Sequence, residues 1–150
     1  MRLSFIIKHH FLSAFRELFV HHHSSLEFRA KIFALLISAN DDSDVKSYIV
    51  VKQIAKKIYN NDENRADLLM ITTKELVNKV KDNNGLYIDT LIANIQKELK
   101  IVPRYATKID INLLKPLLDL TYDEDTKIYQ ERILIFLDGL RKETKINKNK

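Results

Sequence analysis

The scarcity of turn-forming residues constrains this chain more than any other feature. Its 150 residues include only two glycines and two prolines. Glycine supplies the backbone conformations of tight hairpins and phosphate-binding loops, so the chain has little material for β-hairpins or dinucleotide-binding fingerprints. The sequence therefore predicts an all-α fold.

Hydrophobic residues make up 45% of the chain, enough for a domain of this length to bury a core without disulfides or metals. There is no cysteine, which excludes disulfides, thiolate nucleophiles, zinc ribbons and iron–sulfur sites. The same absence fits a reducing cytoplasm, which is the location we expect. No linker or shift in composition divides the helical pattern, so we expect a single domain.

Apolar residues recur at helical spacing along most of the chain. The run FRAKIFALLISA, residues 28–39, is apolar on nearly all sides after Lys31, which predicts a central helix surrounded by others. The preceding SSLE, residues 24–27, has the form of a capping box and predicts the start of that helix. In total we expect a bundle of six or seven helices. Four further inner faces are predicted, made of Tyr48, Val51, Ile54, Ala55 and Ile58; of Leu69, Thr73, Leu76, Val77 and Val80; of Ile88, Leu91, Ile92, Ile95 and Leu99; and of Tyr129, Ile133, Phe136, Leu137 and Leu140.

Polar residues and prolines divide these helices. NND at 60–62 and DNNG at 82–85 are stop signals, because asparagine and glycine tolerate the left-handed backbone that ends a helix. Pro103 is expected to close a loop and Pro116 to interrupt a short helix that Asp110 caps. The final helix is expected to begin near residue 125.

The two ends of the chain are expected to differ from the helical domain of residues 24–141. Residues 1–23 have apolar runs broken by Lys8, His9 and His10, so they fit neither a membrane span nor a secretory signal. Their helical spacing predicts an amphipathic helix packed on the domain; alternatively this helix contacts a membrane surface or a protein partner. Residues 142–150 are expected to form a basic, disordered tail.

The side chains that often carry catalysis give no constellation here. All five histidines lie within the first 23 residues, and adjacent histidines on a helix point in different directions, so neighbours cannot converge on one metal ion. No serine lies in a Gly-x-Ser-x-Gly elbow. We therefore expect no enzyme, and no catalytic or cofactor-binding residue is nominated.

The net charge of +5 comes largely from the end of the chain, because RKETKINKNK holds five basic residues and one acid. Lys52, Lys56 and Lys57 are interpreted as the solvated face of a helix. Nucleic-acid binding through these lysines and the tail is kept as an alternative and ranks last among the functions considered.

The acidic segment NDDSD, residues 40–44, follows the central apolar run. Counted from Asn40 as an EF-hand loop, it places Val45 where glycine is required and Val51 where a bidentate glutamate is required, so the EF-hand interpretation fails. Aspartate and serine are favoured N-caps, and negative charge suits the start of a helix. The segment is therefore expected to end one helix and cap the next.

The segment FRAKIFALLISANDDSDVKSYIVVKQIAKKIY, residues 28–59, resembles the tellurite-resistance TerB-like family. In that family a buried, Ala-rich helix ends in an Ala-Asp-Gly type of turn, followed by acids and an amphipathic helix. Residues 39–44 match this turn, although Asp42 stands in place of the glycine or the glycine is absent. The segment LLDLTYDEDTKIYQERILIFL, residues 117–137, resembles a second copy, with Glu124 among its acids and Glu131 as a late candidate ligand.

The resemblance implies a compact all-α domain whose two acidic turns lie near one another and hold a divalent cation, Ca²⁺ or Mg²⁺. Domains of this family are associated with stress responses, membrane-linked complexes and fusion to cochaperones. The resulting hypothesis is a non-enzymatic interaction module that has a protein partner and a weak cation site. The candidate metal ligands are Asp41, Asp42, Asp44, Asp123 and Asp125.

Overall fold

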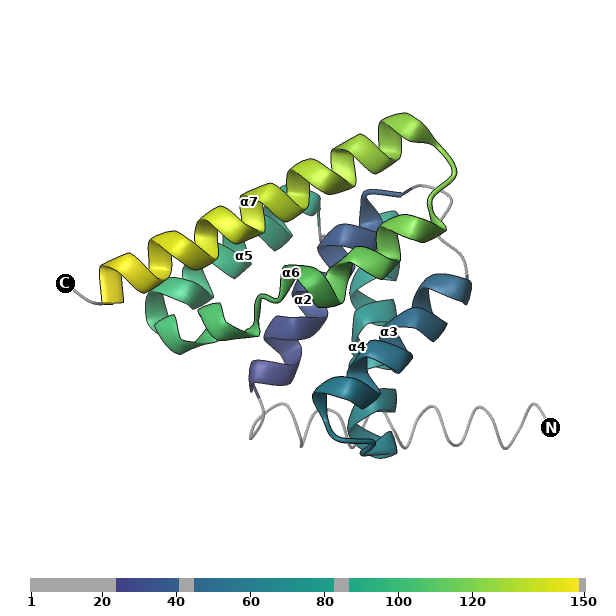
Figure 1. Cartoon of the computed structure of the whole chain (residues 1–150), viewed down its shortest axis with the longest axis horizontal. Helices are drawn as coiled ribbons and strands as arrows, with labels where there is room; N and C mark the ends of the chain where they lie inside the picture. Colours follow the sequence, from purple (N-terminus) through teal and green to yellow (C-terminus); the bar gives the residue numbers. More distant parts are fainter. Residues whose placement is uncertain (1–23, 41–44, 83–86, 149–150) are drawn as a thin grey trace.

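The structure, a computed structural model, describes residues 24–40, 45–82 and 87–148. Within these ranges the chain forms helices and no strand, which confirms the predicted all-α class (Figure 1). The described helices are α2 (Ser24–Ser38), α3 (Val45–Ile58), α4 (Glu63–Lys81), α5 (Ile88–Ile101), α6 (Ile111–Leu114) and α7 (Glu124–Lys148), with two 3₁₀ helices, η1 (Pro103–Lys108) and η2 (Lys115–Leu120).

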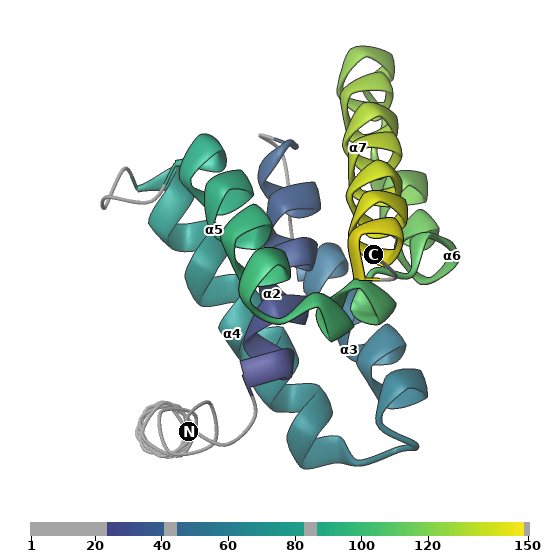
Figure 2. The same cartoon turned by 90° about the vertical axis from the view of Figure 1, so that its left-hand side faces the viewer.

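The helix α2 forms the centre of the core. Every residue from Ile32 to Ser38 is buried, and the helix packs against α4, α5 and η1. Two perpendicular views show α2 between these elements (Figure 1 and Figure 2). A helix that is apolar all round is stable only when other elements cover it, so the predicted central helix is confirmed. It begins at Ser24, where the capping-box motif predicts a helix start.

The helices α3 and α4 form a hairpin beside α2. The buried residues of α3 include Val51 and Ile54, in the predicted register. In the turn that follows, Asn60 and Asn61 adopt positive φ angles of 53° and 66°. Asparagine tolerates this left-handed conformation better than most residues do, which confirms the predicted stop. The carboxylate of Asp62 then caps α4 by accepting from an amide of its first turn.

The segment after α5 contains a 3₁₀ helix that was not predicted. Pro103 closes the preceding loop as expected, and it does so as the first residue of η1. A proline is compatible with the first turn of a helix, because the amide hydrogen that it lacks has no partner there. The carboxylate of Asp110 caps α6 as predicted, accepting from the amides of Asn112 and Leu113 at 3.1 and 3.4 Å. Pro116 also interrupts the helix as predicted, since α6 ends at Leu114 and continues as η2.

Two expectations for α7 were wrong. The helix continues to Lys148, so most of the segment expected to be a disordered tail is helical. Tyr129 and Phe136, predicted on the inner face, are 44% and 37% exposed. The buried face instead contains Gln130 and Leu134 together with the predicted Ile133 and Leu137. Helical spacing is the same for a face rotated by one residue, so spacing alone does not determine which side turns inward.

The helix predicted for residues 1–23, with all five histidines, lies outside the described residues. Among the helices that the structure describes, none is both long and apolar enough to cross a membrane.

Candidate functional site

The two predicted acidic turns are linked by a contact between residues that lie beside their aspartates. Asn40 lies in the first turn, directly before its aspartates, and its amide nitrogen Nδ2 lies 3.5 Å from Oγ1 of Thr121, as in a long hydrogen bond. Thr121 stands two residues before Asp123, in the second turn. The end of α2 and the segment that leads into α7 therefore lie side by side. Three of the candidate metal ligands, Asp41, Asp42 and Asp44, lie outside the described residues.

A chain of buried hydrogen bonds continues from this contact into the core. The hydroxyl of Thr121 donates to Oε1 of Gln130 at 2.8 Å, and Nε2 of Gln130 donates to the backbone carbonyl of Leu36 at 3.2 Å. Gln130 is only 2% exposed. The last carbonyls of a helix have no partner within the helix, so Gln130 satisfies one of the groups that α2 leaves open. We call Asn40, Thr121, Gln130 and the Leu36 carbonyl the polar junction.

The described acids of the second turn serve the start of α7. The carboxylate of Asp123 accepts from the hydroxyl of Thr126 at 2.6 Å and from the amide of the same residue at 3.2 Å. The hydroxyl and backbone hydrogen bonds from Thr126 lower the pKa of Asp123 below its usual value. Asp125 lies exposed in the first helical turn, where negative charge is favoured. In the ranges that the structure describes, no three histidine, aspartate or glutamate side chains gather as a metal site would require.

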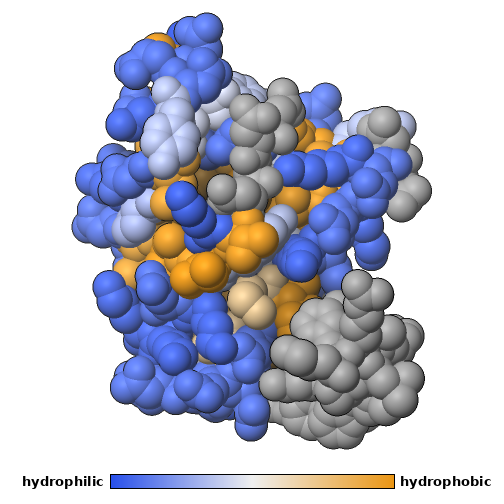
Figure 3. Space-filling model, turned by 90° about the vertical axis from the view of Figure 1, so that its right-hand side faces the viewer, coloured by the Kyte–Doolittle hydropathy of each residue, from blue (hydrophilic) through white to orange (hydrophobic). Residues whose placement is uncertain are grey.

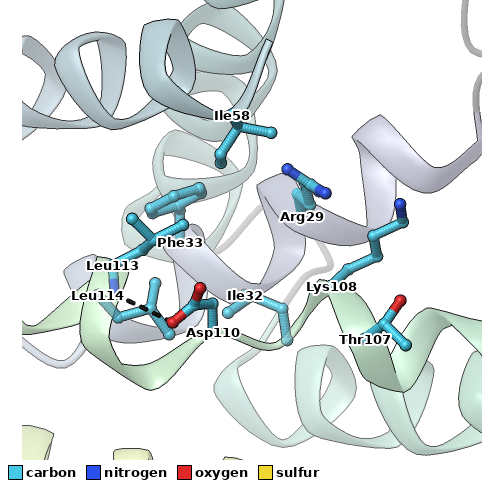
Figure 4. A pocket seen from close by; sticks show the side chains of 9 residues that line it. All are labelled: Arg29, Ile32, Phe33, Ile58, Thr107, Lys108, Asp110, Leu113 and Leu114. Carbon is cyan, nitrogen blue, oxygen red and sulfur yellow. Dashed lines mark hydrogen bonds between the residues drawn. The ribbon is translucent and has the colours of Figure 1, made fainter. Parts of the chain in front are cut away.

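A second site, which the sequence reasoning missed, is a pocket with a volume of about 190 Å³ between α2, η1 and α6 (Figure 4). Its floor is apolar and its rim carries two cations and one carboxylate. We call it the basic pocket. It is lined by Arg29, Ile32 and Phe33 of α2, by Ile58 at the end of α3, by Thr107 and Lys108 of η1, and by Asp110, Leu113 and Leu114.

The guanidinium of Arg29 is half-buried at the rim of this pocket. It lies 5.5 Å from the ring centroid of Tyr59, within the range of a cation–π interaction. In the described part of the chain the guanidinium of Arg29 has no ion pair within 4 Å. Asp110 attracts its charge only from a longer distance. Burial lowers the pKa of Arg29, while Tyr59 and Asp110 act in the opposite direction. The charge of Arg29 is therefore only partly compensated.

Lys108 adds a second half-buried positive charge to the pocket. Its pKa is lowered first by burial and then by repulsion from Arg29 and Arg104. The single carboxylate of the pocket, Asp110, already accepts two amide hydrogens through Oδ1 as the cap of α6. The pocket thus has more positive than negative charge. No local motif could have indicated it, because Arg29 and Lys108 are far apart in the sequence.

The lysines considered for nucleic-acid binding mostly face acids of α4. Nζ of Lys52 lies 2.8 Å from Oδ1 of Asp67, and Nζ of Lys56 lies 3.2 Å from Oε1 of Glu63. The hydrogen bond with Asp67 raises the pKa of Lys52, an effect that burial opposes. Of the three lysines, only Lys57 is exposed without such a pair in the described structure. The paired lysines offer less positive charge to a phosphate backbone than the sequence suggested.

Comparisons of the chain with known protein families, with curated proteins and with solved structures found no significant match.

Proposed function

We propose that this chain is a non-enzymatic helical interaction module of the TerB-like kind, acting in a cytoplasmic stress response, and that its two acidic turns share a divalent cation. The observation that supports the proposal is the contact between Asn40 and Thr121 at 3.5 Å. It joins two residues that lie beside the aspartates of the two turns, as a shared cation would require.

The chemistry of the turns suits a hard cation. Calcium takes six to eight oxygen ligands, and carboxylates contributed by two turns supply the charged part of such a shell. Both Thr126 hydrogen bonds go to Oδ2 of Asp123, so neither of them uses Oδ1. Asp125 is not needed as the cap and is exposed. A cation held between the turns would connect the end of α2 to the start of α7, and thus stabilise the folded chain.

The test is thermal unfolding of the full chain with CaCl₂ or MgCl₂, each compared with NaCl at equal ionic strength. A cation at about five times its Kd should add about 1 kcal/mol, which raises Tm by about 2–4 °C for a domain of this size. The variants Asp42→Ala and Asp125→Asn should abolish the rise. The matched control is Asp62→Asn, because Asp62 is an exposed aspartate at another turn, where it caps α4.

Two results would contradict the cation site. One is the absence of any specific rise at about 10 mM of either cation, well above the Kd range of weak extracellular calcium modules. The other is an equal rise in the wild type and in both acidic-turn variants.

The interaction part of the proposal is supported by exposed apolar side chains. On α7, Ile128 and Ile135 are 41% and 72% exposed and lie seven residues apart, on one side of the helix. On α3, Val45 and Ile49 are exposed one turn apart. Figure 3 shows apolar surface in the middle of one face of the molecule. A contiguous exposed apolar patch is typical of proteins that bind other proteins, and we propose that the exposed pairs on α3 and α7 contribute to partner binding.

A further inference from the structure

The basic pocket holds two cations that the fold neutralises only in part. Arg29 comes from α2 and Lys108 from η1, and Figure 4 shows both side chains at the same pocket, with Asp110 apart from their charged ends. A guanidinium has five N–H donors, and in the described structure those of Arg29 have no hydrogen-bonded acceptor within the pocket. Partial burial of two like charges is unfavourable, and a bound anion would offset this cost.

The residues that line the pocket also define the charge of the counter-ion. Arg29 and Lys108 carry one positive charge each, and Asp110 carries one negative charge. The lining residues sum to one positive charge, and Arg104, outside the lining, also acts on Lys108. An anion is therefore attracted, and a monoanion meets less repulsion from Asp110 than a dianion such as phosphate does. The planar fork of an arginine matches the two oxygens of a carboxylate.

The floor of the pocket determines the rest of the ligand. Ile32, Phe33 and Ile58 form it together with Leu113 and Leu114, so a bound molecule must place apolar atoms there. The volume of about 190 Å³ is below the range of about 300–1,000 Å³ that is usual for drug-sized ligands. The space suits one side chain or one small ring.

We propose that the basic pocket binds a carboxylate attached to a small apolar group, either a free organic acid or the C-terminal residue of a peptide. Arg29 and Lys108 hold the carboxylate, and Phe33 with its apolar neighbours holds the attached group. The proposal concerns a different site from the acidic turns and does not depend on a cation.

The test is titration of the full chain, without divalent cations, with phenylacetate and with phenylacetamide. The two probes have nearly the same shape, but only phenylacetate carries the charge. We expect calorimetry to show saturable binding of phenylacetate. Phenylacetamide should bind with an affinity lower by about tenfold or more. The amide signals of α2 and η1 should shift in NMR spectra during the titration.

Charge-removing variants locate the binding. We expect the affinity for phenylacetate to fall by about tenfold or more in each of the variants Arg29→Gln and Lys108→Gln. Arg132→Gln is the matched control, because Arg132 is exposed on α7 and does not line the pocket, and it should leave Kd unchanged. Circular dichroism checks that each variant is folded. Should Arg29→Gln fail to fold, Lys108→Gln on η1 decides the question by itself.

A peptide ending in phenylalanine, with a free or an amidated C-terminus, separates the two sources of the carboxylate. Tighter binding of the free-ended peptide than of phenylacetate identifies a peptide terminus. Binding of phenylacetate but of neither peptide identifies a free acid. The proposal is overturned if phenylacetamide binds as well as phenylacetate, if neither phenylacetate nor the free-ended peptide saturates, or if both pocket variants bind phenylacetate like the wild type.

Discussion

The helices α2 and α7 contain similar apolar residues but use them in opposite ways. In α2 every residue from Ile32 to Ser38 is buried, whereas α7 exposes Ile135 at 72% and Tyr129 at 44%. The reason is position: α2 packs against α4, α5 and η1, while α7 lies along the outside of the bundle (Figure 1). An apolar helix is therefore buried on all sides only where neighbouring elements surround it, whereas an outer helix such as α7 buries one side.

The polar junction is where these two helices meet. Gln130 of α7 donates to the Leu36 carbonyl of α2, so the outer helix is joined to the central one by a buried polar group as well as by apolar contacts. The comparison between the helices then separates three kinds of contribution to stability: the apolar core, the buried polar contact and the exposed cap of α7.

The largest expected effect contrasts the two helices directly. Leu35→Ala, at a position with no exposed surface, should lower the free energy of unfolding by about 2–5 kcal/mol, because it removes buried apolar surface and leaves a cavity. Ile135→Ala should change it by about 0.5 kcal/mol or less, since most of that side chain already contacts water. Urea denaturation measures both. Similar losses at the two positions would contradict the assignment of α2 as core and of this side of α7 as surface.

An intermediate effect is expected at the polar junction. Gln130→Leu nearly conserves volume but leaves the Leu36 carbonyl and the Thr121 hydroxyl without this partner, so we expect a loss of about 1–3 kcal/mol. Gln53→Leu is the matched control, because Gln53 is exposed on α3. The measurement is again urea denaturation. An unchanged midpoint for Gln130→Leu would show that the junction does not contribute to stability.

The smallest expected effect is at the exposed start of α7 and depends on pH. Hydrogen bonds from Thr126 lower the pKa of Asp123 in the folded chain, so the unfolded state binds the proton more readily. The stability from Asp123 is therefore present above the unfolded pKa, near 4, and is lost as pH falls through the lower, folded pKa. Asp123→Asn should make the acid side of a plot of urea midpoint against pH less steep.

Thr126→Val tests the cause of this pH dependence. The substitution removes the shorter of the two Thr126 hydrogen bonds to Asp123. It should therefore also make the acid side of the plot of urea midpoint against pH less steep, but by less than Asp123→Asn does. Acid branches that superimpose for all three proteins would show that the cap of α7 does not titrate in this way.

Much of the fold could be predicted because helix signals are local. The backbone hydrogen bonds of a helix join residues four apart, so caps and breaks are visible in short stretches of sequence. Asp110 and Pro116 have the roles that their neighbours predict. Phe136 does not, because the inward side of α7 is selected by its packing and by the buried hydrogen bonds of Gln130, whose partners include a residue in α2.

The candidate sites also combine features that local sequence determines with features that only packing determines. The sequence by itself determined the all-α class, the buried character of α2 and the capping role of Asp110, since each depends on neighbouring residues. Only the tertiary structure decided that Asn40 meets Thr121 and that Arg29 and Lys108 line one apolar pocket. These contacts join helices that are distant in the sequence, and Coulomb forces and hydrogen bonds depend on distance in space, which packing sets.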